Sequence, residues 1–479
     1  MNNTRGDSDY QTRLAILFAL TAGIIFWGLG SIPLMSLNEA RRAIPISGMF
    51  QTGNWLLPYL NGELYIDKPP LFYWASLLFA CVAGTINEWI FRLPSALAAS
   101  AIMFATFMVC RRTFDKWQAL FAVLVLATCT NFVIFARRGE IEMLLTALCS
   151  GSLFCAHEFI VGNGKLRTLY CSYLLMGAAL LCKGPVALLF VHLPVLLMTW
   201  QQPRARVFIG HPLGWLLMLA VGLSWYGVVT QQLGMDVWQR VFQADISQKI
   251  AGHTNRDPLY SYALYVLADF MPWVLLLLLA PMKTWRNWRS NPSRMFFLYG
   301  ALVPFIVLSL FANKHAKYLL PAYPAMAILV SARLAEFFNE GSRKIRLAFT
   351  SMVLLLLTGY LVFFAALESK IFNYRFSAMQ DIHQLAQQYP ATTVYGFQEV
   401  DMRTVYYLGK PVKLAAPKEL AASASNDEPA FLLLEKDKWL TLIDTSHWHE
   451  VLRLTPYTSK DQTAVVLGND AFIKQQRKP

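Results

Sequence analysis

Charged side chains are scarce in this chain of 479 residues: they make up 15% of it, whereas hydrophobic residues make up 56%. Soluble globular proteins carry about 25% charged residues, so the composition excludes an ordinary soluble protein. Apolar runs of about 17–25 residues, the length of helix that crosses a bilayer, recur from Leu14 to about Leu367. The sequence therefore predicts a polytopic α-helical membrane protein.

Cysteine is confined to seven positions between 81 and 182, all in or beside apolar stretches, and none has metal-like spacing with histidine. This distribution argues against disulfides and zinc ribbons. No tight cluster of acids and histidines requires a metal, so no cofactor is predicted and dependence on a divalent metal stays open. A cleavable signal is also lacking: Arg5 and Arg13 precede a long apolar run without a small-residue cleavage site, which predicts a retained first helix.

Acidic residues are fewer than basic ones, and the formal net charge is +13. A nucleic-acid partner would be the usual inference from such a charge, but the lysines and arginines occupy short loops between apolar runs. The head groups of membrane phospholipids explain this placement, and no nucleic acid is predicted as a partner.

Apolar length and turn residues predict eleven spans: 14–35, 91–110, 117–135, 141–160, 167–182, 185–200, 213–230, 259–281, 295–312, 318–338 and 347–367. The apolar run after Lys68-Pro69-Pro70 is predicted to be re-entrant or interfacial, because another full span would place the later basic loops outside. With about 11–13 helices and a cytoplasmic N-terminus, the basic loops are cytoplasmic, as the positive-inside rule requires.

Two domains are predicted on this basis. Residues 1–367 form the membrane body, with an outward loop at 36–70, and residues 368–479 form a small periplasmic domain. In that tail, apolar stretches at 392–397, 404–409, 431–435 and 464–468 alternate with polar segments. The alternation is typical of a small α/β domain.

Several basic residues break the positive-inside pattern, because they fall at outward helix ends or in outward loops. We expect them to face an anionic ligand near the outer membrane surface. They are Arg41, Arg42, Lys68, Arg137, Arg138, Lys183, Lys249, Arg256, Lys314 and Lys317.

The outward loop begins with a short segment predicted to be an amphipathic helix. Residues three apart share a helix face, so Asn38 lies with Arg41 and Glu39 with Arg42. This spacing can set a carboxylate beside a phosphate-binding guanidinium, or form a surface salt bridge without a chemical role. Further along, Asp67 and Lys68 precede a rigid Pro-Pro pair that fixes the entry of the next helix.

Glu140 and Glu142 fall where a span re-enters the membrane, a depth at which acids usually line a cavity. A structural ion cluster with Arg137 and Arg138 is the alternative. Lys183, followed by Gly-Pro, and the pair Lys314 and Lys317 stand at the ends of apolar runs. Each lysine is either part of a site or a helix-end anchor.

Six motifs in order resemble a known family: N-E-A-R-R, G-N-W-L-L-P, N-G-x-L-Y-x-D-K-P-P-L-x-Y-W, A-R-R-G-x-x-E-M, C-K-G-P and K-Y-L-L-P-A-Y-P. The family is that of the lipid A aminoarabinose transferases, membrane glycosyltransferases of the GT-C superfamily related to protein O-mannosyltransferases. The resemblance implies a sugar donor carried on undecaprenyl phosphate, a lipid or glycan acceptor, and an active site at the periplasmic surface of the bacterial inner membrane.

The resemblance also implies roles for single residues. Arg41, Lys68 and Lys249 match cations that hold the lipid phosphate, and Tyr318 matches a tyrosine near it. Glu142 matches a second acid that is usually Asp, and Asp67 stands where Glu is more common. We expect Asp67, Arg138, Lys183 and Lys314 to support the site.

One departure from the family concerns the position of its catalytic Asp, which is Asn38 here and cannot take a proton. Glu39 or Glu142 is then predicted to act, unless the chain relies on positioning and phosphate stabilisation more than on a strong base, or has lost transferase activity. The rival functions are a transporter or flippase for an anionic lipid and an inactive lipid-binding relative. A transporter usually shows an internal repeat and charge at mid-membrane, and neither is evident here.

Overall fold

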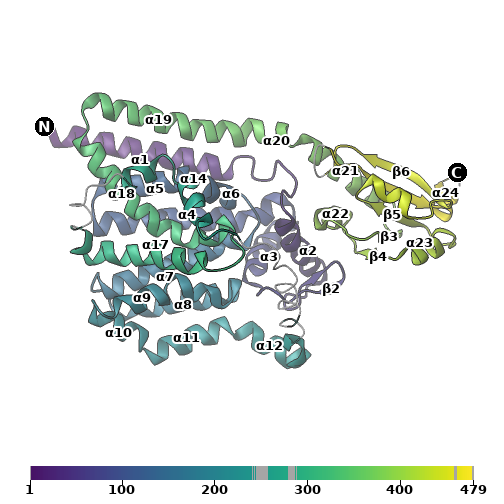
Figure 1. Ribbon diagram of the computed structural model, residues 1–479, viewed down its shortest axis with the longest axis horizontal. Coiled ribbons are helices and arrows are strands. Elements are labelled where there is room, and N and C mark those ends of the chain that lie inside the picture. The colour runs from purple at the N-terminus through teal and green to yellow at the C-terminus, as the bar shows by residue number, and fades with distance from the viewer. Residues whose placement is uncertain are drawn as a thin grey trace. The chain divides into compact units, whose positions relative to one another are not determined.

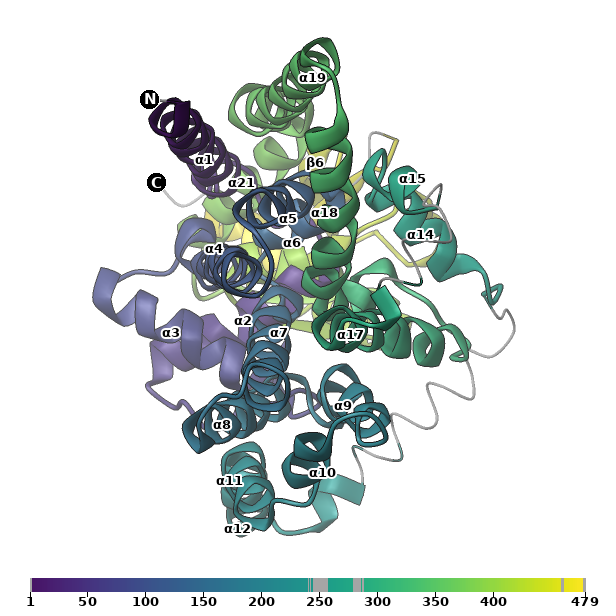
Figure 2. The same ribbon diagram turned by 90° about the vertical axis from the view of Figure 1, so that its left-hand side faces the viewer.

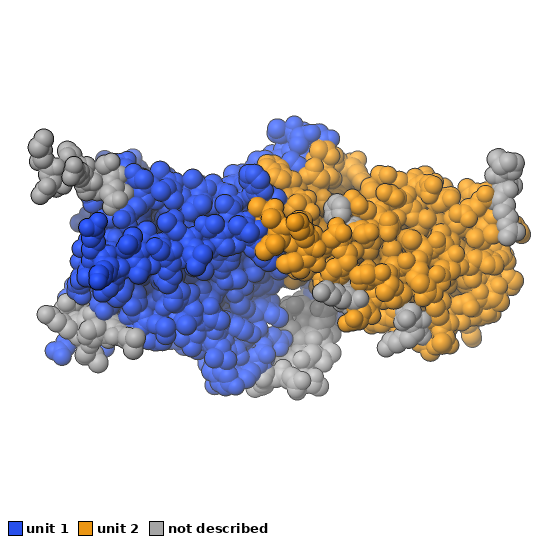
Figure 3. Space-filling model, turned by 90° about the horizontal axis from the view of Figure 1, so that it is seen from above, with its two compact units in different colours: residues 1–29, 66–84, 90–364 blue, residues 30–65, 85–89, 365–479 orange. Residues whose placement is uncertain are grey.

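The computed structural model describes residues 2–239, 241, 243, 257–278, 286, 288–457 and 461–476. It divides into two compact units (Figure 3). The first unit comprises residues 1–29, 66–84 and 90–364, and the second comprises residues 30–65, 85–89 and 365–479. The predicted domain boundary at residue 367 stays a prediction.

The first unit is helical, and its long helices run side by side, as Figures 1 and 2 show. In chain order the helices are α1 (Asn2–Phe26), α3 (Leu71–Ala83), α4 (Glu88–Thr113), α5 (Lys116–Thr128), α6 (Thr130–Ala136), α7 (Ile141–Ile160), α8 (Leu166–Lys183), η1 (Pro185–Phe190), α9 (His192–Met198), α10 (Pro203–Ile209), α11 (Pro212–Gly222), α12 (Ser224–Leu233), α14 (Ser261–Asp269), α15 (Trp273–Leu278), α17 (Pro292–Ser309), η2 (Ala316–Ala322), α18 (Tyr323–Glu340) and α19 (Arg343–Val362).

Within the described residues, five helical stretches are long and apolar enough to cross a membrane, and two bent pairs raise the number to seven. The five are Glu88–Thr113, Ile141–Ile160, Pro292–Ser309, Ala316–Glu340 and Arg343–Ile371. The other predicted spans fall on shorter or less apolar helices. The chain is thus a multi-pass helical membrane protein, and α3, with 13 residues, has the short length expected of the segment after Pro70.

Buried polar contacts hold the helix ends of this unit, where backbone groups lack partners within the helix. A bend of 73° separates α5 from α6. There Asp269 accepts a hydrogen bond from the backbone N–H of Asn131 at 2.8 Å. At the end of α1, the guanidinium of Arg137 donates to the carbonyls of Ile24 and Trp27 at 2.7 and 2.8 Å. Inside hydrocarbon no water can bond to the unpaired backbone groups of a helix end, so these contacts stabilise the bundle.

The second unit combines the predicted amphipathic helix with the C-terminal sheet. Its elements are α2 (Leu37–Thr52), β1 (Tyr59–Leu60), β2 (Glu63–Leu64), α20 (Glu368–Ile371), α21 (Asn373–Gln388), β3 (Thr393–Gly396), α22 (Met402–Leu408), β4 (Val412–Leu414), α23 (Pro417–Ala424), β5 (Ala430–Leu434), η4 (Asp437–Leu442), β6 (Trp448–Leu454), β7 (Ala464–Asn469) and α24 (Asp470–Gln476). A π-helical turn, η3 (Phe363–Leu367), spans the boundary between the units.

Five strands form a mixed sheet in the order β4-β3-β5-β7-β6. β3 pairs in parallel with β4 and β5, whereas β7 pairs antiparallel with β5 and β6. All five residues of β5 are buried, as a central strand covered on both faces requires. The small α/β domain is confirmed, but the apolar stretch at 404–409 forms helix α22, because Asp401 caps its start and Gly409 ends it in the left-handed region.

Residues 30–65 are bound to the C-terminal part of this unit by specific hydrogen bonds. Asn61 makes two bonds with the backbone of Val412, at 2.7 and 2.9 Å. The hydroxyl of Tyr407 accepts from the backbone N–H of Leu34 at 3.0 Å and donates to Glu88 at 2.5 Å. The amphipathic helix and the sheet therefore belong to one folded body.

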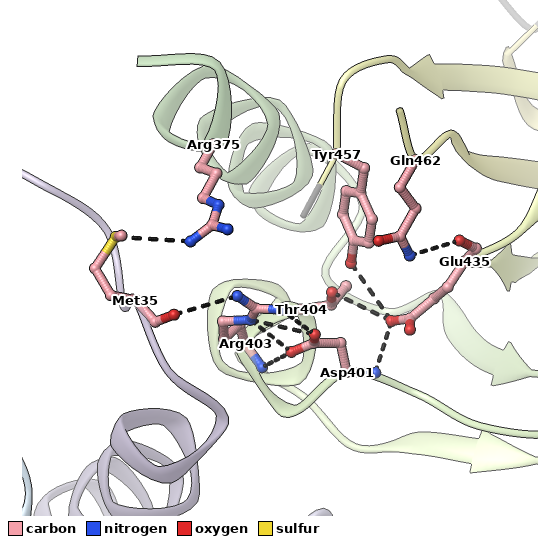
Figure 4. A network of polar contacts seen from close by, with 8 residues as sticks. All are labelled: Met35, Arg375, Asp401, Arg403, Thr404, Glu435, Tyr457 and Gln462. Atoms are coloured by element: carbon pink, nitrogen blue, oxygen red, sulfur yellow. Dashed lines mark hydrogen bonds and ion pairs between the residues drawn. The ribbon is translucent and has the colours of Figure 1, made fainter. Parts of the chain in front are cut away.

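A buried polar network lies beside α22 (Figure 4). The carboxylate of Glu435 accepts from the backbone N–H of Asp401 at 2.6 Å. Arg403 pairs with Asp401 at 2.5 Å and donates to the carbonyl of Met35 at 3.3 Å. Burial raises the pKa of Glu435 to about 7, because a carboxylate loses its hydration inside the unit.

We expect Glu435→Gln to make the unfolding of the chain less sensitive to pH. The folded state keeps on Glu435 a proton that the unfolded state releases between pH 4.5 and about 7. This contribution to stability is complete below pH 4.5 and is lost as the pH rises to about 7. Thermal unfolding should show that the free energy of unfolding of the variant, relative to that of the wild type, rises by about 3 kcal/mol between about pH 5 and about pH 8.

The matched control is Glu450→Gln, an exposed carboxylate whose pKa is lowered by its hydrogen bond to Arg453. Because Glu450 stays charged over the whole range, its variant should run parallel to the wild type. Equal pH slopes for the wild type and Glu435→Gln would show that Glu435 does not titrate in this window.

Candidate functional site

The start of α7 brings two acids to one place in the first unit. Glu140 is the N-cap residue of α7 and Glu142 lies in its first turn. Carboxylates are favoured there because the helix N-terminus carries partial positive charge. Their side chains are only 2% and 9% exposed, respectively, so they need partners to remain charged.

The partner helix α8 ends with the complementary charge. Lys183 is its last residue, at the negative end of the helix dipole. Gly184 follows with φ +85°, a conformation that glycine adopts without strain, and Pro185 starts η1. The Lys-Gly-Pro motif thus ends α8 sharply and leaves the ammonium at the helix terminus, and α8 packs along α7.

A third element, η2, supplies the cation that joins the two acids. The Nζ atom of Lys317 lies 3.0 Å from Glu140 and 3.4 Å from Glu142. Glu142 also pairs with Lys183 at 3.2 Å, and Glu140 lies 3.9 Å from Arg138. We call this alternating row, Arg138-Glu140-Lys317-Glu142-Lys183, the charge ladder.

The charge ladder has three cations and two anions and therefore a net charge of +1. Its lysines are 15% and 17% exposed, more than either acid. Tyr318 adjoins one end, where the Nζ atom of Lys183 lies 4.8 Å from its ring centre. Such an arrangement can present ammonium groups at fixed positions to an anion, with the carboxylates as counter-charges.

Gly139, which precedes the first acid of the charge ladder, cannot carry a side chain because the ring of Phe91 lies too close. A Cβ atom added at Gly139 would overlap the ring of Phe91, which is fully buried and packs edge-on against Phe72 at 6.1 Å. Gly139 immediately precedes Glu140, so the backbone position of the first ladder acid depends on this contact.

Two other predicted outward cations serve the backbone. Arg137 donates to the carbonyls at the end of α1, as described above. Lys314 is 3% exposed and donates from Nζ to the carbonyls of Asp257 and Phe311, at 2.9 and 2.7 Å. These contacts match the helix-end anchor considered for Lys314, and its supporting role in a site stays a prediction.

The second unit holds Glu39 and the start of the outward loop. α2 begins at a cap in which Ser36 accepts from the backbone N–H of Glu39 at 3.0 Å. Glu39 is fully buried and accepts from the backbone N–H of Met35 at 2.7 Å. Arg42 is also buried, whereas Asn38 is half-buried and Arg41 is exposed, as expected from the predicted sharing of helix faces.

The remaining predicted site residues have simpler placements. Asp67 is exposed and Lys68 is half-buried, both just before α3 in the first unit. Lys249 and Arg256 lie outside the described residues. In the part of the chain that the structure describes, no group of three or more His, Cys, Asp or Glu is arranged to hold a metal.

The sequence identifies Glu140 as an acid that lines a cavity and Lys317 as an outward cation, but it does not pair them. It assigns single roles to Glu142, Lys183 and Lys314 instead. Lys317 lies 134 positions from Lys183 along the chain. Only the fold shows that it bridges both acids.

The bundle of apolar helices and the small mixed sheet have the GT-C type of fold, as the likeness to solved structures shows. Residues 67–228 match the family model described as dolichyl-phosphate-mannose-protein mannosyltransferase. ArnT from Cupriavidus metallidurans, whose crystal structure is bound to undecaprenyl phosphate, superposes with a TM-score of 0.76 at 19% identity and covers 94% of this chain and 97% of its own.

One further solved structure and two proteins of similar sequence are also related to this chain. The oligosaccharyltransferase of Archaeoglobus fulgidus has a TM-score of 0.55 at 11% identity, over 93% of this chain and 73% of its own. An undecaprenyl phosphate-alpha-4-amino-4-deoxy-L-arabinose arabinosyl transferase of Shewanella sediminis (strain HAW-EB3) is 28% identical over 329 residues, 67% of this chain. An uncharacterized protein of Aquifex aeolicus (strain VF5) is 27% identical over 323 residues, also 67% of this chain.

The matched part covers 59% and 63% of these two relatives, respectively. The chain thus spans about three fifths of the length of the curated relatives that it matches. The resemblance of its motifs to the lipid A aminoarabinose transferases, within the GT-C glycosyltransferases, is confirmed.

Gly139→Ala should lower the melting temperature of the purified chain, because the new methyl group overlaps the ring of Phe91. Overpacking of this kind costs about 1–3 kcal/mol. Phe91→Leu should restore part of the loss in the double variant. Gly359→Ala is the matched control, since nothing lies within 4 Å of its Cβ position. A Gly139→Ala variant as stable as Gly359→Ala would contradict the close packing.

Lys317→Met should destabilise the chain more than Lys344→Met, which removes an exposed lysine at the start of α19. Loss of one partner of a buried ion pair costs about 3–5 kcal/mol, because the remaining charge is left uncompensated. Adding Glu140→Gln to Lys317→Met removes that charge and should recover part of the stability in thermal unfolding. Equal melting temperatures for the two lysine variants would show that the ladder does not stabilise the fold.

Proposed function

We propose that this protein is a glycosyltransferase of the bacterial inner membrane. It moves a sugar from an undecaprenyl-phosphate-linked donor to a lipid, such as a lipid A-like molecule, or to another cell-envelope glycan at the periplasmic surface. The observation that carries the proposal is the charge ladder, which fixes two ammonium groups at helix ends in a membrane protein. The fold and the activity for which the aminoarabinose transferase relatives are named support it.

The reaction needs a stabilised leaving group. The bond from C1 of the sugar to the phosphate oxygen breaks, and the negative charge collects on the polyprenyl phosphate. Lys183 and Lys317 are the proposed donors to that charge, because preorganised cations act most strongly where charge develops. Arg41, Lys68 and Lys249 are proposed to add to them, with Tyr318 beside Lys183.

The reaction also needs a group that takes a proton from the acceptor hydroxyl as its oxygen attacks C1. Glu39 and Glu142 are the proposed candidates, since Asn38 has no acid function. Glu142 has two ammonium groups within 3.4 Å, and phosphate binding would draw these cations away from it. Glu39 is held by the backbone N–H of Met35. Glu142 is therefore our first choice.

The proposed orientation has the N-terminus in the cytoplasm and residues 368–479 in the periplasm. It is supported by the basic residues of the loops at 111–116, 165–167, 204–206 and 343–346, which belong on the cytoplasmic side.

Transfer of radiolabelled sugar from synthetic undecaprenyl-phosphate donors, measured with the purified chain in detergent, tests the proposal. Lys183→Met should lower kcat by about 10²–10³-fold, the usual loss when one charge-stabilising donor is removed. Glu142→Gln should lower kcat by about 10²–10⁴-fold with little change in donor Kd, because it removes a proton acceptor. Lys68→Ala should weaken donor binding as well as transfer.

Lys344→Met, an exposed lysine of α19, is the control and should transfer sugar like the wild type. Wild-type turnover in Lys183→Met and Glu142→Gln would remove the ladder from the reaction. Donor binding without transfer from any of several donors would indicate a lipid transporter or an inactive lipid-binding relative instead.

A further inference from the structure

A cavity of the second unit is lined only by residues of that unit. It has a volume of about 620 Å³ and is lined by α2, the β1–β2 hairpin, residues 86–88, α21, α22 and residues 409–411. Ligand sites in proteins typically have about 300–1,000 Å³. We call this cavity the α2–α22 groove.

Its lysine is not available to an anion. The Nζ atom of Lys410 donates to the carbonyls of Tyr389, Pro390 and Thr392, at 3.0, 3.4 and 2.6 Å. An ammonium group has three N–H donors, so the backbone takes all of them. No arginine is among the described residues that line the groove. A phosphate would therefore find no strong charge-assisted partner there.

The histidine of the groove has a hydrogen-bond partner at each ring nitrogen. Nδ1 of His383 lies 3.0 Å from the carbonyl of Tyr407, and Nε2 lies 2.9 Å from the side-chain amide of Gln387. The lysine and the histidine of the groove are thus both engaged by the protein itself.

The groove does offer aromatic rings and amides. Tyr59 is 47% exposed, and Tyr406 packs edge-on against Tyr407 with ring centres 5.1 Å apart. Tyr407 is fixed by its hydroxyl, which bonds to Leu34 and Glu88. The exposed amides of Gln51 and Gln380 can each donate and accept hydrogen bonds.

This combination matches the chemistry of a sugar ring. Tyrosine presents an apolar face with a polar edge, which suits the C–H face and the hydroxyls of a pyranose. Side-chain amides pair with hydroxyl groups in both directions. A phosphorylated ligand needs cations, and the lysine of this groove is already bound by the backbone. The wall combines apolar side chains such as Ile44, Ile86 and Met379 with hydroxyl and amide groups, which suits a ring that has an apolar C–H face and polar hydroxyls.

We propose that the α2–α22 groove binds an uncharged sugar unit of a glycan, and that this unit belongs to the acceptor. The assignment to the acceptor rests on the proposed transferase function, whereas the binding of an uncharged sugar rests on the groove alone. The phosphates of an acceptor would then bind elsewhere.

The probe is the core oligosaccharide released from lipopolysaccharide, dephosphorylated, and its binding to the full chain in detergent is followed by saturation-transfer NMR and calorimetry without donor. Tyr59→Ala and Gln380→Ala should each weaken binding about 5- to 10-fold, the loss expected for one stacking or hydrogen-bonding contact. Gln388→Ala, an exposed glutamine of α21 outside the groove, should bind like the wild type. The changed side chains are exposed, so the melting temperatures should agree.

Binding of the dephosphorylated probe that is equal in the groove variants and in Gln388→Ala would overturn the proposal. So would a phosphorylated core that binds at least tenfold more tightly and loses that advantage in Tyr59→Ala. Oligosaccharide binding that depends on the groove, in a chain that transfers no sugar, would reject the transferase function and keep the groove. Sugar transfer with an unchanged acceptor KM in Tyr59→Ala and Gln380→Ala would keep the transferase function and reject the groove as an acceptor site.

Discussion

The need to give every buried helix end a partner determines where charge lies in the first unit. A helix leaves four N–H groups and four carbonyls unpaired at its ends, and hydrocarbon supplies no water for them. Asp269 serves the start of α6 and Arg137 serves the end of α1. The acids at the start of α7 and the lysine at the end of α8 also lie at helix ends, where the helix dipoles favour their charges. They meet because these two helices pack antiparallel.

This rule separates two kinds of outward cation that look alike in the sequence. Arg137 and Lys314 donate to backbone carbonyls, and these bonds stabilise the fold. Lys183 and Lys317 face carboxylates instead. An ion pair can exchange a partner when an anion arrives, whereas a set of backbone bonds gives way only if the helix end does. The ladder lysines are therefore better suited to a ligand than their neighbours.

The multi-pass helical body and the small α/β tail could be predicted because both rest on local patterns of apolar residues. The helix at Ile141–Ile160 has the predicted limits, and Asn38 to Arg42 begin a helix with the expected faces. Long-range geometry could not be predicted. Lys317 meets Glu140 only in the folded chain, and residues 404–409 form a helix because Asp401 and Gly409 cap an apolar stretch that alternation alone would assign to a strand.

The bonds that tie residues 30–65 to the C-terminal sheet bear on how such chains diverge. Asn61 binds Val412, and Leu34 binds Tyr407, across more than 350 positions of sequence. Recombination at a single point near residue 367 would give a descendant the strands of one parent and the amphipathic helix of another, with mismatched partners at each of these bonds. Inheritance is expected to conserve the two segments jointly, so substitutions at these contacts should arise as pairs in both segments rather than by exchange of the tail.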